Sequence, residues 1–250
     1  MGHVRLGRLP TSQKWKEIIA LLGDDGTSAQ TLAEAVANAS IKDLEKAASN
    51  KTLVAIHEML VNIPQAAKEK DFQAALKKIG IDVPKNPTLD HIAIGMAKAI
   101  DAVAAQNHQH PDLGRMAKES AISTFLDMTD NASQTLWGST TDDMQSGVAS
   151  FADTARFGEF NQRFHADLSY RILNYHLDRE MPRHVATTGR FPTIADMNVF
   201  QAGLRKHCME SSMIMRTFAR DWLGKQYASK TKDGSRPKID AKKSAGFIYV

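Results

Sequence analysis

Apolar residues recur at intervals of three and four positions along most of this 250-residue chain. The clearest run follows Thr88, a residue type that is common at the N-cap of helices. Its apolar positions are Leu89, Ile92, Ala93, Met96, Ile100, Val103 and Ala104. At 3.6 residues per turn, these positions share one face of an α-helix. Apart from residues 247–250, no stretch suggests a strand, and the chain is therefore predicted to be all-α.

Capping residues and chain breakers divide the first half of the chain into short predicted helices. Ser, Thr, Asp and Asn favour helix starts, whereas Gly and Pro favour helix ends. The predicted helices run from residues 11–12 to Gly23, from 27–28 to 48 with a break near Ser40, from Asn50 to Pro64, from Asp71 to Gly80, and onward from Asp112.

Two longer helices are predicted in the second half. The first runs from about Asp153 to Met181, carries an aromatic-rich apolar stripe and is followed by Pro182. The second runs from Thr193 to about Leu223. Its predicted buried face consists of Phe200, Leu204, His207, Ser211, Ile214, Phe218 and Trp222. We expect the two helices to pack together within an irregular multi-helix bundle.

Two segments have the composition of connections between helical parts. Residues 81–87 contain two prolines and no helical period, and residues 224–243 are rich in Ser, Thr, Lys and Gly. The predicted organisation is an N-terminal helical subdomain over 1–82, a main helical bundle over 88–223, and a basic loop and tail over 224–250. A single domain that contains all three parts is the alternative.

Composition indicates a globular chain without a membrane span. Hydrophobic residues form 42% of it and charged residues 24%, both close to globular averages. The N-terminus lacks the apolar core of a signal peptide, and no apolar run approaches the roughly 20 residues of a membrane-spanning helix. One cysteine, Cys208, can form neither an internal disulfide nor a multi-cysteine zinc site. These features predict a cytoplasmic location.

Positive charge is concentrated at the C-terminal end. Residues 201–250 contain eleven Lys and Arg against four Asp and Glu, whereas residues 1–200 are slightly acidic. Because basic side chains neutralise phosphates and aromatic rings stack on bases, this end is a candidate nucleic-acid or anion-binding surface. The candidate residues are Arg216, Arg220, Trp222, Lys225, Tyr227, Lys230, Lys232, Arg236 and Lys238. The alternative is that these charges only solvate a helix face and a loop.

Several histidines invite comparison with metal ligands. His108 and His110 lie one residue apart in an expected interhelical loop, and His165 and His176 lie eleven residues apart on one predicted helix. The second pair is separated by three turns, or about 16 Å, which is too far to share one ion. We expect these side chains to hydrogen-bond to neighbouring groups, and no metal or cofactor is predicted.

Motifs of catalysis are absent from the chain. His207 and Cys208 are adjacent, but consecutive helical residues point about 100° apart and cannot form a thiol–imidazole pair. Cys208 is therefore interpreted as a packed residue. Phosphate-binding loops, the nucleophile elbow and the zinc-protease motif do not occur. No catalytic residue is predicted.

Three hypotheses of function follow. The first is a non-catalytic helical interaction subunit of a larger cytoplasmic bacterial protein assembly, favoured by the missing catalytic motifs and by 11 methionines, which adapt to partner surfaces. The second is an accessory protein that binds nucleic acid without sequence preference through its basic end. The third is a metal-dependent helical enzyme that uses some of the histidines, including His184. Protein partners are expected, and a homo-oligomer is compatible with the pattern.

Overall fold

The computed structural model describes residues 13–24, 26–28, 31–32, 34–35, 38, 50–106, 111–133, 140–178, 180–186 and 190–229. These residues are mostly helical, and their only β-structure is an isolated bridge between Val185 and Phe191. The predicted all-α fold is confirmed. The elements are α1 (Gln13–Gly23), α3 (Lys51–Ala66), α4 (Phe72–Lys78), α5 (Leu89–Gln106), α6 (Pro111–Ser133), α7 (Thr141–Ser150), α8 (Thr154–Leu177), the 3₁₀ turn η1 (Met181–His184), α9 (Ile194–Ser211) and α10 (Met213–Ala228).

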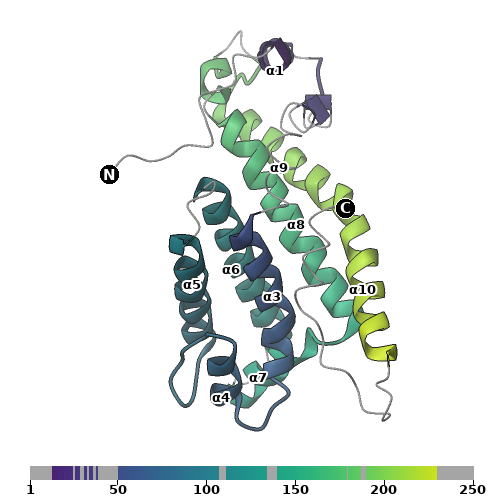
Figure 1. The fold of residues 1–250 in the computed structure, drawn as a ribbon. Coiled ribbons are helices and arrows are strands. Elements are labelled where there is room, and N and C mark those ends of the chain that lie inside the picture. Colours follow the sequence, from purple (N-terminus) through teal and green to yellow (C-terminus); the bar gives the residue numbers. More distant parts are fainter. Residues whose placement is uncertain are drawn as a thin grey trace.

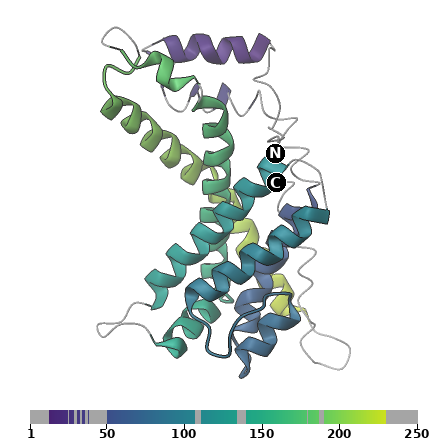
Figure 2. The same cartoon turned by 90° about the vertical axis from the view of Figure 1, so that its left-hand side faces the viewer.

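Helix α8 runs through the middle of the molecule and contacts α6, α9 and α10. Helices α3, α5 and α6 form a bundle beside it, with α4 and α7 at one end and α1 and η1 at the other (Figure 1). Helix α9 is inclined to α8 (Figure 2). The two long helices expected in the second half therefore do pack together. Among the described residues, no helix combines the length and apolar character needed to cross a membrane.

The largest core is formed by side chains from the helices α3 to α8. It joins residues from before and after the 81–87 segment, including Ile56 of α3, Phe125 of α6 and Phe164 of α8. The division of the chain near that segment remains a prediction, but side chains from both sides of it share this core.

Two smaller clusters attach the remaining helices to α8. The cluster at the α1 end consists of Ile18, Leu32, Tyr170, Leu173, Leu177, Met181, Phe191, Leu204 and Cys208. The cluster beneath α10 consists of Val61, Phe157, Met215, Ala219 and Leu223. Burial of these apolar side chains is what holds α9 and α10 against the rest of the protein.

The predicted helix starts are confirmed where short polar side chains cap them. Asn50 Oδ1 accepts the backbone amides of Thr52 and Leu53 at 2.9 and 3.2 Å. Asp71 and Asp153 cap α4 and α8 in the same way, and Thr193 forms a capping box at the start of α9. Each cap satisfies amides that have no partner within the helix.

The long helix predicted over 193–223 is wrong in one respect, because it is broken at Ser212. That residue has φ −79° and ψ 4°, well away from the helical ψ near −42°.

Three further boundaries differ from the prediction. Helix α3 continues through Pro64 to Ala66, although this proline lacks the amide that would bond to the Leu60 carbonyl. Helix α8 ends at Leu177, four residues early, and the chain then forms η1. Helix α7 was missed, although its Thr140–Asp143 capping box is readable in the sequence.

The contact between α8 and α10 depends on a glycine. A β-carbon at Gly158 would lie 2.6 Å from the backbone oxygen of Arg216, closer than such atoms approach in proteins. Glycine therefore lets the two backbones approach at this point. This contact places α10 alongside α8 and leaves the opposite face of α10 toward solvent.

Candidate functional site

The predicted basic surface is described only in its first part. Arg216, Arg220 and Lys225 are exposed on α10, and Arg220 Nε lies 3.1 Å from Asp221 Oδ1. Arg216 and Arg220 are one turn apart and share an edge of the helix. Lys230, Lys232, Arg236 and Lys238 lie outside the described residues.

The two aromatic residues of that surface are engaged in packing. The Tyr227 hydroxyl accepts a hydrogen bond from Gln65 Nε2 at 2.9 Å and donates one to the Ala152 carbonyl at 2.6 Å. The Trp222 ring lies 6.1 Å from the ring of Phe157, centroid to centroid. These contacts attach α10 to α3 and α8. The two rings therefore contribute to the packing of α10, whether or not they also contact a ligand. Binding of nucleic acid by this surface stays a prediction.

Most of the large exposed apolar side chains of the described residues lie on α9 and α10. Among the described residues, one large exposed apolar side chain, Ile94, lies on α5. The others lie on the two consecutive C-terminal helices: Ile194, Val199, Met209, Met213, Ile214 and Phe218. We call these six the α9–α10 apolar surface. Val199 is 72% exposed and Ile194 66%, so both project into solvent.

The buried face of these two helices differs from the predicted one, which explains part of this exposure. The sequence pattern predicted that Ile214 and Phe218 would be buried, and this is wrong, because Met215, Ala219 and Leu223 face the core in their place. From Cys208 of α9 onward the buried face lies one position later than predicted, and Ile214 and Phe218 therefore face outward. Sequence reasoning missed the surface because it chose a face one position away from the buried one, already at His207 of α9. The buried positions Leu204, Cys208, Ser212, Met215, Ala219 and Leu223 keep steps of three and four across the break.

A cleft opens where α6, α8 and α9 meet. Its volume is about 330 Å³. Its floor comes from α8, its walls from α6 and α9, and its lining is Ser123, Thr124, Asp127, Arg163, Ala166, Asp167, Tyr170, Arg205 and Met209. The α8 residues are spaced i, i+3, i+4 and i+7, which places them on one face of that helix. Met209 belongs both to the cleft and to the α9–α10 apolar surface.

Two arginines enter the cleft from different helices. Arg163 is fixed by Glu159, whose Oε1 accepts from Nε at 3.1 Å and from Nη2 at 2.8 Å. Arg205 lies over the ring of Tyr170, with 3.7 Å between the guanidinium carbon and the ring centroid. Such cation–π contacts orient a guanidinium while leaving its edge open to further hydrogen bonds.

Two carboxylates face these arginines at longer range. Arg163 Nη1 lies 4.0 Å from Asp127 Oδ2, and Arg205 Nη1 lies 3.9 Å from Asp167 Oδ1. Both distances exceed that of a hydrogen bond, unlike the 2.6 Å between Arg171 Nε and Asp167 Oδ2. The sequence offered no signal for this cleft, because its residues come from segments that only packing brings together.

His165 packs against His57 and not against His176, the histidine with which the sequence spacing had paired it. Its ring centroid lies 5.1 Å from that of His57 on α3, and the ring of Phe164 contacts both at 5.0 and 5.4 Å. Burial lowers the pKa of His165 to about 4 and, with the charge of His165 as a second cause, lowers that of His57 well below its usual range. Both rings are therefore neutral at pH 7. The side chain of His176 lies outside the description.

The remaining candidates for metal or thiol chemistry are distributed along the chain. No three His, Cys, Asp or Glu side chains within the described residues could hold one ion together. His108 and His110 lie outside those residues, and His184 is part of η1.

Cys208 is buried, as predicted, and burial raises the pKa of its thiol to about 11. The adjacent His207 is only half-buried, so the sequence prediction that it lies on the buried face is wrong. Its Nε2 lies 3.4 Å from the Ser211 hydroxyl on the same helix.

The fold and these surfaces define an all-α, irregular multi-helix protein. No protein-family model, curated protein or solved structure matches the chain. Its function must therefore be inferred from the chemistry of its own surfaces.

Proposed function

We propose that this protein is a non-catalytic helical subunit that binds another protein through the outer faces of α9 and α10. The observation that supports this function is the α9–α10 apolar surface, which holds six of the large exposed apolar side chains found in the described part of the chain. Single exposed apolar residues are common on protein surfaces, but their concentration on neighbouring elements is typical of interaction sites.

The charges around this surface favour an acidic partner. On α10, the exposed Arg216, Arg220 and Lys225 outnumber the exposed Asp221, whereas on α9 Arg205 and Lys206 are balanced by Asp196 and Glu210. Arginine is enriched in protein interfaces, and basic side chains at the rim of an apolar patch steer partners of opposite charge. The partner surface is therefore expected to combine apolar side chains with Asp and Glu, as on an amphipathic helix.

The test compares the same kind of substitution, an exposed apolar residue replaced by glutamate, at two places on the protein. Val199→Glu combined with Ile214→Glu places charges within the α9–α10 apolar surface, whereas Ile94→Glu places one on the exposed face of α5. Proteins that co-purify with the tagged wild-type chain from its native host are identified, then purified, and their affinities for each variant are measured by calorimetry. Loss of binding in the double variant alone is expected. Equal binding by all three chains, or no partner that binds after purification, contradicts the proposal.

Nucleic-acid binding through α10 is the second candidate function. Its support is the exposure of Arg216, Arg220 and Lys225, since a row of cations on one helix can follow a phosphate backbone. The packing of Trp222 and Tyr227 against α8 and α3 favours a purely electrostatic contact over stacking on bases.

A further inference from the structure

Two methionines of the α9–α10 apolar surface are exposed to solvent. Met209, in the last turn of α9, is 39% exposed, and Met213, the first residue of α10, is 50% exposed. Among the other methionines of the described residues, Met197 is half-buried and none of the rest exceeds 8% exposure. These buried methionines are Met59, Met96, Met116, Met128, Met144, Met181 and Met215.

The two exposed methionines lie where the two helices join. They are four positions apart, on either side of the break at Ser212. The Met209 carbonyl accepts a hydrogen bond from Gln162 Nε2 at 3.0 Å, which fixes this end of α9 to α8. The exposure of Met209 is therefore a property of packed helices and does not depend on a loop.

An exposed thioether can be oxidised by a peroxide. The sulfur atom attacks one oxygen of hydrogen peroxide, an S–O bond forms while the O–O bond breaks, and the second oxygen leaves as water. The sulfur loses two electrons and the peroxide gains them. The product, methionine sulfoxide, is polar, and methionine sulfoxide reductases convert it back to methionine. Because the peroxide arrives from water, exposed methionines should react before buried ones.

The cysteine of the chain is protected from the same oxidant. Cys208 precedes Met209 but is only 3% exposed. Peroxides react with the thiolate, and burial raises the pKa of the Cys208 thiol to about 11, so the thiol stays protonated at pH 7. Of the described sulfur atoms, those of Met209 and Met213 are therefore the ones most open to peroxide.

From these observations we propose that Met209 and Met213 form a reversible oxidation site for hydrogen peroxide, and that their conversion to sulfoxides releases the partner from the α9–α10 apolar surface. The release rests on the proposed protein-binding function, whereas the selective oxidation does not. Oxidation changes two of the six apolar members of this surface into polar groups. An apolar partner side chain that covered a sulfoxide would leave its oxygen without a hydrogen bond, which is costly.

The first test needs no partner. The full chain is treated with millimolar hydrogen peroxide at pH 7, and peptide mapping by mass spectrometry follows each methionine. Met209 and Met213 should each gain one oxygen atom while Met96 and Met181, which are fully buried, stay unmodified. The treated chain should elute earlier from a hydrophobic-interaction column, and methionine sulfoxide reductases should restore the original elution. Equally fast oxidation of the buried methionines, or an unchanged elution, overturns the proposal.

The second test uses a variant that keeps the surface apolar. Met209→Leu combined with Met213→Leu conserves side-chain volume and removes both thioethers. Its elution should not respond to peroxide, and the partner identified from the native host should bind it equally before and after treatment. The oxidised wild-type chain should bind that partner about tenfold more weakly or less.

The outcomes separate this inference from the proposed function. If the oxidised wild-type chain binds the partner as tightly as the untreated chain, the release is refuted, while loss of binding by Val199→Glu with Ile214→Glu would leave the proposed function intact. If no partner binds, the proposed function and the release both fail. The peptide mapping and the elution then decide the oxidation site alone.

Discussion

The ring of His57 on α3 lies 5.1 Å, centroid to centroid, from the ring of His165 on α8, inside the main core. Phe164 contacts both rings nearly edge-on, at interplanar angles of 88° and 72°. The Nε2 atom of each histidine is buried. Charging either ring would place a cation in an apolar site, which is why the pKa of each is lowered.

This pair predicts a loss of stability in mild acid. In the unfolded chain both histidines take up protons below pH 6.5, whereas His165 in the folded chain resists protonation down to about pH 4. The free energy of unfolding should therefore fall between pH 6.5 and 4, by up to about 1.4 kcal/mol per pH unit for each histidine. Urea denaturation at a series of pH values measures it. The variant His165→Phe should show a shallower decline, and an unchanged slope would refute the assignment.

We expect alanine at Gly158 of α8 and alanine at Gly224 of α10 to change the stability of the protein in opposite directions. Gly158→Ala should destabilise the protein by about 1–3 kcal/mol, because the new β-carbon would press against the backbone oxygen of Arg216. Gly224→Ala is the matched control: it adds the same methyl group within α10, where nothing lies within 4 Å. It should stabilise the protein by about 0.5–1 kcal/mol through helix propensity. Chemical denaturation at neutral pH measures both, and equal effects would contradict the close approach of α8 and α10.

We expect removal of the Tyr227 hydroxyl to weaken the packing of α10 against the rest of the protein. Tyr227→Phe keeps the ring but deletes the hydrogen bonds with Gln65 and the Ala152 carbonyl. The expected cost is about 1–3 kcal/mol, since both former partners lose a contact in a half-buried place. Hydrogen exchange should show faster opening of α10 than in the wild type. Exchange that is accelerated evenly over the whole chain would instead indicate global destabilisation.

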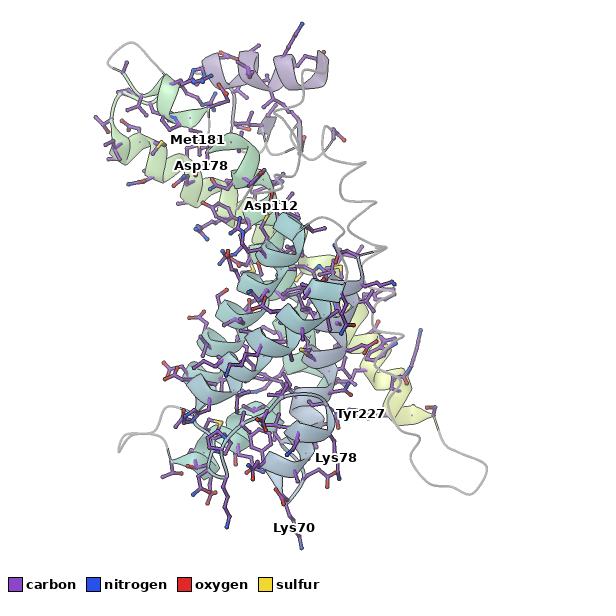
Figure 3. All side chains as sticks on the ribbon, turned by 60° about the vertical axis from the view of Figure 1, so that its left-hand side comes forward. Lys70, Lys78, Asp112, Asp178, Met181 and Tyr227 are labelled. Carbon is purple, nitrogen blue, oxygen red and sulfur yellow. The ribbon has the colours of Figure 1, made fainter. Side chains whose placement is uncertain are left out.

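Charge reversal separates the nucleic-acid hypothesis from general electrostatics. Arg216→Glu, Arg220→Glu and Lys225→Glu together should abolish salt-dependent binding of duplex DNA in fluorescence anisotropy, if α10 is the interface. The matched control reverses Lys70, Lys77 and Lys78, which are exposed on α4 or just before it and do not belong to α10 (Figure 3). Equal losses in both variants would indicate attraction to net charge alone, and no binding by the wild type would end the hypothesis.

Comparison of particular helices shows where sequence reasoning succeeded. Asn50, Asp71 and Thr193 were identified as helix starts, and each caps its helix in the structure. The same reasoning failed on α9 and α10, where it chose a face one position away from the buried one: it assigned His207 to the core, whereas Cys208 and Met215 are buried. Ile214 and Phe218 were consequently assigned to the core and are found at the surface.

Local contacts along the chain determine the all-α class, the starts of the helices and the basic character of the C-terminal end. A cap or an i, i+4 pair involves residues at most four positions apart, and the sequence shows both partners at once. The cleft between α6, α8 and α9, the pairing of His57 with His165 and the exposure of α9 and α10 are different. They join residues that are far apart in the chain, and which of them meet depends on the burial of apolar surface over the whole fold.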